Sequence, residues 1–186
     1  MVVRFFLTKA YSAFLCFILL VSFLFVLSGC SSVDVKGYED YQPRLIPESF
    51  FTGDLTAHGV VKNRSGKVIR MFNATIKASW KDGVGTLDED FIFDDGEKQK
   101  RVWTLFPASK NSYAATAGDV VGVGSAKLGG NSLFLQYVLR VPYNDSTIDL
   151  SIDDRMYLVD KNTLINESGM YKFGVRVGTI LLVIKK

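Results

Sequence analysis

Four charged side chains occupy positions that a strand-like alternation otherwise gives to apolar residues: Arg70, Glu89, Arg101 and Asp154. Side chains two residues apart on a strand share a face, so each of these charges is expected to point inward with its apolar neighbours. A buried charge is costly unless it is paired. The four could anchor the polar head of a ligand, hold a hydrolytic water, or form a structural ion network that closes one end of the fold.

The predicted hairpin 84–108 offers a pairing for two of these charges. A three-residue loop at 95–97 would place Glu89 opposite Trp103 and diagonal to Arg101. Diagonal neighbours on one face of an antiparallel pair are within reach of each other. We therefore expect a salt bridge between Glu89 and Arg101.

A further carboxylate, Asp119, lies between glycines in the segment GDVVG. Such glycines allow a strand bulge or a close approach of another backbone, which makes Asp119 a candidate binding residue. The aromatic residues of the inward rows are ordinary core residues or the walls of a pocket for an acyl chain. The candidate ligand-binding residues are Arg70, Glu89, Arg101, Trp103, Asp119, Tyr137 and Asp154.

No residue pattern assigns a catalytic group, a metal or a cofactor. His58 is the single histidine, and a zinc site needs several nitrogen or sulfur ligands. The spacings of a serine nucleophile elbow and of a phosphate-binding loop are both absent. Asp153 and Asp154 are adjacent on a predicted strand, so they point to opposite faces and cannot act on the same atom.

Cys30 carries the clearest chemical signal. Arg4 and Lys9 precede a nearly apolar run at 10–27, which ends in Leu-Ser-Gly-Cys. A basic start, an apolar core and small residues at the end are typical of a secretory signal peptide, although a membrane-spanning helix is the alternative. The ending resembles the lipobox of bacterial lipoproteins. That resemblance implies a lipidated Cys30 and, with Ser31 after it, the periplasmic face of the outer membrane of a Gram-negative bacterium.

The expected organisation is a signal peptide at 1–29, a lipidated cysteine and tether at 30–46, and one domain at 47–186. Cleavage would remove two of the 22 basic residues and none of the 19 acids, which leaves 20 against 19. This near-neutral balance argues against a nucleic-acid partner. Cys16 would be removed with the signal, so we expect no disulfide.

The predicted domain reads as consecutive strands separated by Gly, Asn and Asp turns. The expected strands are 54–62, 67–80, 84–94, 98–108, 112–127, 132–142, 146–160 and 171–184. We expect an up-and-down antiparallel β-barrel of about eight strands, with a short N-terminal helical turn at 47–50. A two-sheet sandwich is the rival.

Several short motifs lie along the chain, at 50–53, 64–66, 70–72, 87–93, 95–97, 101–103, 118–122, 130–131, 153–156 and 172–174, with Asn166. Together they resemble the DUF3833 lipoproteins, a family of unknown function. The resemblance covers nearly all of the chain after the signal and implies a lipocalin-like barrel on the outer membrane.

The function that these expectations favour is binding without catalysis. A lipid-anchored barrel would hold a lipid, a fatty acid or another apolar ligand, with Arg70, Arg101 or both meeting an acidic head. The alternatives are an enzyme acting on membrane lipids, with Glu89, Asp119 or Asp154 as acid or base, and a non-catalytic envelope interaction module. Sequence alone leaves open whether the barrel is packed or hollow.

Overall fold

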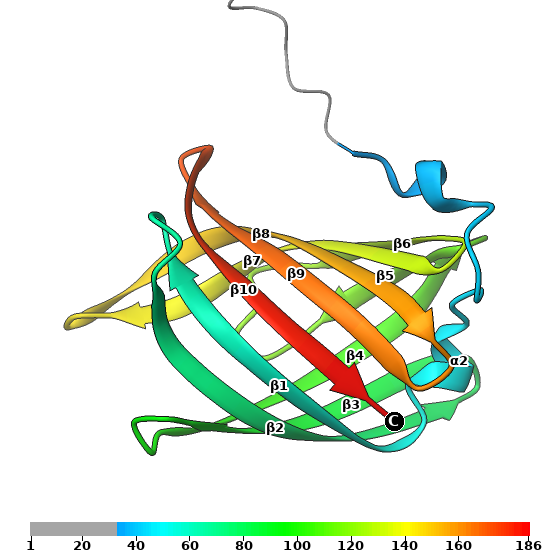
Figure 1. The fold of residues 1–186 in the computed structure, drawn as a ribbon, viewed down its shortest axis with the longest axis horizontal. Helices are drawn as coiled ribbons and strands as arrows, with labels where there is room; N and C mark the ends of the chain where they lie inside the picture. The colour runs from blue at the N-terminus through cyan, green and yellow to red at the C-terminus, as the bar shows by residue number, and fades with distance from the viewer. Residues whose placement is uncertain (1–32) are drawn as a thin grey trace, which may run out of the picture. The chain divides into compact units, whose positions relative to one another are not determined.

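The computed structural model describes residues 33–186, and Figure 1 shows how their elements are arranged. A 3-10 helix, η1 (Val35–Tyr38), and a single α-helical turn, α2 (Pro47–Phe50), precede ten strands. The strands are β1 (Gly53–Asn63), β2 (Val68–Lys81), β3 (Val84–Phe93), β4 (Lys98–Ser109), β5 (Ser112–Thr116), β6 (Gly124–Gly129), β7 (Ser132–Tyr143), β8 (Ser146–Asp160), β9 (Thr163–Lys172) and β10 (Val175–Lys185).

The sheet closes on itself because β1 pairs with β10 as well as with β2. Val60 of β1 lies opposite Leu181 on one side and Met71 on the other. Closure removes the open sheet edges that would otherwise need covering. The up-and-down antiparallel barrel is therefore confirmed, and it lies within the compact unit Val35–Lys186, which contains every strand pairing that the fold needs.

The barrel has ten strands where about eight were expected. The predicted strand 112–127 is two short strands, β5 and β6, joined by a segment at 117–123 in which Gly122 has a positive φ of 74°. The prediction also missed β9. Its inward row alternates Leu164 with the polar Asn166 and Ser168, so it lacks the apolar periodicity of a recognisable strand.

The short strands β5 and β6 leave the barrel wall incomplete near one end. β5 pairs with β4 only over Thr104–Ser109, so residues 98–103 of β4 have no strand partner on that side within the described chain. The segment 117–123 bonds instead to β7, where Arg140 N donates to Asp119 O at 2.8 Å. This contact holds Asp119 on the β7 side of the gap.

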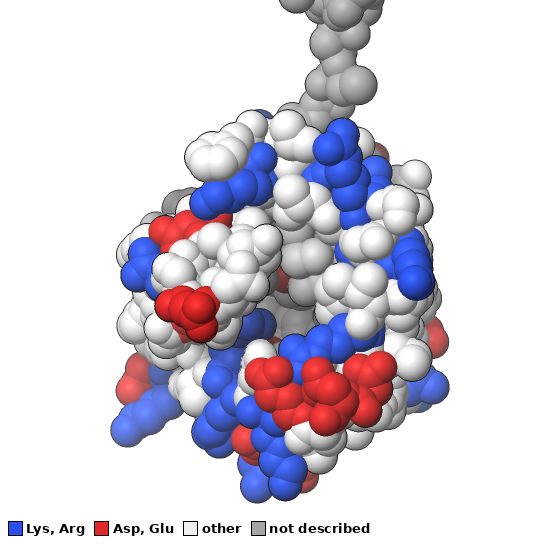
Figure 2. All heavy atoms as spheres, turned by 90° about the vertical axis from the view of Figure 1, so that its left-hand side faces the viewer, with Lys and Arg blue, Asp and Glu red and all other residues white. Residues whose placement is uncertain are grey.

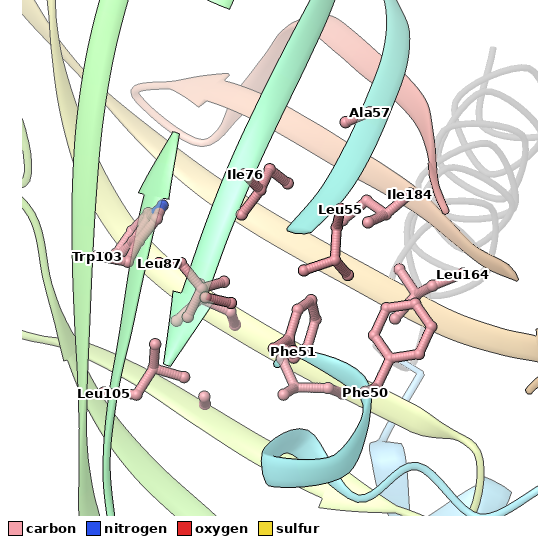
Figure 3. Packing of buried hydrophobic residues seen from close by; sticks show 14 of the residues in the cluster. Phe50, Phe51, Leu55, Ala57, Ile76, Leu87, Trp103, Leu105, Leu164 and Ile184 are labelled. Carbon is pink, nitrogen blue, oxygen red and sulfur yellow. The ribbon is translucent and has the colours of Figure 1, made fainter. Parts of the chain in front are cut away.

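The other end of the barrel is closed by α2 and the residues beside it. Phe50 and Phe51 are almost fully buried and lie edge to face, with ring centroids 5.0 Å apart. The indole Nε1 of Trp80 donates to Phe51 O at 2.7 Å. Figure 3 shows both rings among the leucines of the surrounding strands, so the helical turn expected at 47–50 forms the floor of the barrel.

The inward rows are the ones that the alternation predicts, but one register differs. Phe72, Ala74 and Ile76 of β2 are buried, whereas the residues between them are exposed. The connection between β3 and β4 has four residues, 94–97, because β3 ends at Phe93 and β4 begins at Lys98. Glu89 therefore lies directly opposite Arg101, and the expected pairing of Glu89 with Trp103 is wrong by two residues.

Replacing Phe51 with alanine should destabilise the protein by about 3 to 4 kcal/mol, because a ring that is 3% exposed would leave a void in the floor. Phe106→Ala is the matched control. Phe106 lies on the outer face of β4 and is 43% exposed, so its loss should cost less than about 1 kcal/mol. Urea unfolding of residues 31–186, followed by circular dichroism, measures both changes, and equal losses would contradict the role of Phe51.

Candidate functional site

The barrel is hollow. A cavity of about 670 Å³ occupies its interior and is lined by residues from all ten strands. Figure 2 looks into the barrel from the end opposite α2, where a hollow is visible among charged and uncharged side chains. The floor residue Phe51 and the rim residues Arg70 and Arg140 all line this cavity, so it extends from the closed end to the open one.

One side of the cavity is apolar. β1, β2 and β10 contribute Ala57, Ile76, Ile180, Leu182 and Ile184 to its lining. The polar groups come from the rest of the ring, on β3, β4, the 117–123 segment and β7 to β9. The cavity thus combines an apolar section of its wall with groups that can form hydrogen bonds.

Arg101 is held by Asp119 across the gap in the wall. Its Nη2 lies 2.7 Å from Asp119 Oδ2, and its Nε lies 3.0 and 3.1 Å from the two carboxylate oxygens. The salt bridge expected between Glu89 and Arg101 is not formed, although the two residues are directly opposite each other. The guanidinium pairs with Asp119 instead, because the 117–123 segment places the carboxylate beside the edge of β4 that has no strand partner in the described chain.

Glu89 consequently faces the cavity with no hydrogen bond or ion pair to any described residue. Its remaining exposed surface faces the cavity rather than the outside of the barrel. Burial raises the pKa of Glu89 from 4.5 to about 7, and the negative charges of Asp154 and Asp119 add to this shift while Arg101 opposes it. Near neutral pH the side chain therefore exists in both protonation states.

Asp154 faces Glu89 from β8, which lies on the other side of the ten-stranded ring from β3. Its side chain is 6% exposed, and its Oδ1 accepts hydrogen bonds from Asn166 Nδ2 and, at 2.8 Å, from Ser168 Oγ. Its Oδ2 has no partner among the described residues. Burial raises the pKa of Asp154 to about 6, against the lowering effect of these hydrogen bonds.

Two aromatic candidates line the same level of the cavity. The rings of Trp103 and Tyr137 meet edge to face, with centroids 5.0 Å apart. The Tyr137 hydroxyl makes no hydrogen bond within the described chain. Burial raises the pKa of Tyr137, and the charge of Asp154 raises it further, so the hydroxyl keeps its proton and can donate or accept.

Arg70 lies apart from this group, at the mouth of the cavity. It pairs with Asp95 at 2.8 Å and Glu97 at 2.5 Å, and its guanidinium lies 3.6 Å from the ring centroid of Phe93. All seven candidate residues line the cavity, but the structure brings only six of them together in its middle. Ser168 was not predicted as a site residue, because its strand was missed. Asn166 entered the sequence analysis only as part of the family resemblance.

The chemistry of this arrangement follows from its charge balance. The charge of Arg101 is already matched by Asp119, and that of Arg70 by the two acids of the β3–β4 loop. Glu89 lies opposite Arg101 but forms no ion pair with it, and Asp154 forms none within the described chain, so the middle of the cavity carries an excess of acceptors. It is suited to a bound group that donates hydrogen bonds or carries positive charge.

The remaining sequence signals lie elsewhere. His58 lies outside the cavity lining, with its Nδ1 2.6 Å from Asn73 Oδ1. In residues 33–186 no group of acidic, histidine or cysteine side chains could hold a metal ion, and no helix is long and apolar enough to cross a membrane. Cys30 and the predicted signal peptide lie outside the described residues.

Comparisons with known proteins identify a family and a fold. Residues 24–186 match the model of a family described as "Protein of unknown function (DUF3833)". No curated protein matches the sequence. Among solved structures, the S-type phycobiliprotein lyase CPES from Guillardia theta is similar with a TM-score of 0.54 and 10% sequence identity, covering 82% of this chain and 96% of that chain. This likeness shows a shared lipocalin-like barrel.

Glu89→Gln should stabilise the protein at pH 8 by roughly 2 to 3 kcal/mol, since the substitution removes an ionised carboxylate from the cavity wall. A raised carboxyl pKa lowers stability as pH rises from about 4.5 to about 7, so the gain should vanish near pH 5. Melting temperatures across this pH range measure the effect. The outward-facing Glu167→Gln is the control, and a pH-independent difference for Glu89→Gln would contradict the assignment.

Proposed function

We propose that this chain, which belongs to the DUF3833 family, is a binding protein that holds an elongated apolar ligand inside its barrel. The observation that carries the proposal is the cavity of about 670 Å³. Pockets for small ligands have volumes of roughly 300 to 1,000 Å³, with mainly apolar walls and a few placed polar groups. The volume and lining of this cavity fall within that description.

The polar groups favour a particular kind of ligand. The three cavity arginines, Arg70, Arg101 and Arg140, already face carboxylates, so an acidic head would have to displace one of these acids. Glu89 and Asp154 lack such partners, and a group lying between them would meet acceptors from both sides. We therefore propose that the bound molecule has an apolar body and a cationic or hydrogen-bond-donating group, such as an amine.

The proposed location follows from the sequence around Cys30. The Leu-Ser-Gly-Cys ending supports cleavage and lipidation at this cysteine, with Ser31 favouring the outer membrane. Several acyl chains anchor a protein stably, whereas one chain binds only reversibly. In this proposal the barrel works in the periplasm, held by lipid at its N-terminal end.

A second candidate function is acid–base catalysis on the bound molecule. The pKa values of about 7 for Glu89 and about 6 for Asp154 suit groups that exchange protons near neutral pH. Turnover of a ligand that wild-type protein binds, lost in Glu89→Gln without loss of binding, would favour this candidate. The name of the similar lyase shows that a barrel of this fold can serve an enzyme.

Calorimetry with dodecylamine, dodecanol and dodecanoate tests the binding proposal on residues 31–186. We expect the amine to bind at least tenfold more tightly than the carboxylate, because a charge-assisted hydrogen bond contributes roughly 1.5 to 3 kcal/mol. Amine affinity should rise between pH 5 and pH 8, because below about 7 the amine must displace a proton from Glu89. The double variant Glu89→Gln, Asp154→Asn should lose the preference and still bind dodecanol.

A pair of tryptophan variants on β10 locates the bound molecule. Ile180 lines the cavity, so Ile180→Trp should fill part of it and abolish binding of all three probes. Leu181 faces outward and is 37% exposed, so Leu181→Trp should bind as wild type does. No binding by folded wild-type protein would overturn the proposed function, and preference for dodecanoate would overturn only the proposed head chemistry.

A further inference from the structure

The open end of the barrel carries a feature that the cavity does not explain. The β1–β2 and β9–β10 hairpins are adjacent there, because Asn63 pairs with Gly178. We call residues 62–69 and 172–177 together the basic rim. The basic rim contains no acid and five bases: Lys62, Arg64, Lys67, Lys172 and Arg176.

The basic rim also exposes apolar side chains. Phe173, at the tip of the β9–β10 hairpin, is 93% exposed, and Lys172 Nζ lies 4.9 Å from its ring. Four further apolar side chains of the rim are at least a third exposed: Val68, Ile69, Val175 and Val177. Exposed apolar side chains surrounded by cations form an amphipathic surface, of the kind that binds at a lipid interface.

Phe173 occupies a position that the backbone does not favour for it. The two-residue turn has positive φ at both positions, 52° at Phe173 and 76° at Gly174. Asparagine and aspartate adopt this conformation most readily among residues with side chains. The other described non-glycine residues with positive φ are of these two types: Asp82, Asn111 and Asn144. A phenylalanine that is strained and packs on almost nothing points to a contact outside the chain.

The charge of the basic rim is local. Beside the rim, the β3–β4 loop carries Asp94, Asp95 and Glu97, and the last two pair with Arg70, which follows Ile69 on β2. Near Lys172, Asp149 pairs with Arg140, and its backbone oxygen accepts from Lys172 Nζ at 2.9 Å. No ion pair involves the five rim bases within residues 33–186. An anionic surface would therefore be attracted to the basic rim rather than to the neighbouring β3–β4 loop.

We propose that the basic rim docks on an anionic lipid surface, with Phe173 entering the head-group region and the five bases contacting phosphates. An aromatic residue at the depth of the head groups and several bases near them are the two contributions that hold proteins on such surfaces. Docking there places the mouth of the cavity against lipid. The inference does not depend on which ligand the cavity binds.

Co-sedimentation of residues 31–186 with sucrose-loaded vesicles tests this proposal. The vesicles are phosphatidylcholine alone, or phosphatidylcholine with roughly one third phosphatidylglycerol. We expect wild-type protein to bind the anionic vesicles, to bind neutral ones far more weakly, and to be released as salt screens the charges. Each base near the surface contributes roughly fivefold to partition, so Arg64→Glu with Lys67→Glu should weaken binding more than tenfold.

Two further variants separate the contributions. Phe173→Asn keeps a residue that suits the turn and should weaken binding about tenfold on either vesicle, through loss of the ring. The control variant, Lys81→Glu with Lys161→Glu, changes the net charge by the same amount as Arg64→Glu with Lys67→Glu, but at the closed end of the barrel. It should bind the vesicles within about twofold of wild type. Unchanged dodecylamine affinity and circular dichroism establish that each variant is folded.

Two results would overturn the proposal. Wild-type protein that binds anionic vesicles no better than neutral ones would exclude a lipid surface and leave an acidic protein as the occupant of the rim. Equal loss of binding in the closed-end variant would show that overall charge, rather than the basic rim, drives association.

Discussion

The pairing of β1 with β10 determines what the interior of this protein can be. A closed barrel of eight strands has an interior that side chains just fill, or that holds one small ligand. Ten strands enclose a wider space, and the large floor residues at α2 close it at one end only. The interior that remains is a cavity of about 670 Å³ with an open mouth. Closure therefore supplies both the stability of the sheet and the volume for a ligand.

The interruption between β5 and β6 decides how the charges in that volume are arranged. It brings Asp119 to Arg101, so Arg101 pairs with Asp119 and not with Glu89, which lies directly opposite it. Glu89 and Asp154 then remain as carboxyl groups whose pKa values rise to about 7 and about 6. Unpaired buried carboxyls cost free energy in the empty barrel, and a ligand that donates to them would recover part of that cost. The apolar wall of β1, β2 and β10 offers the rest of such a molecule a matching surface.

Period-two alternation was sufficient to predict which faces turn inward, and so to place Arg70, Glu89, Arg101 and Asp154 toward the interior. It failed where the inward row is polar, as at Asn166 and Ser168 of β9, because the pattern reports burial of apolar residues only. It also could not show that Arg101 would bond to Asp119, since that contact depends on a loop rather than on strand register. Whether the interior is filled depends on the number and tilt of the strands, which no local pattern encodes.

Native mass spectrometry of residues 31–186 after incubation with a bacterial lipid extract tests the central claim most directly. The account predicts a complex with one small molecule whose mass identifies an apolar body with an amine or another hydrogen-bond-donating group. A protein that keeps its unliganded mass, under conditions in which its fold is intact, would contradict the account and leave the cavity without a ligand-binding role.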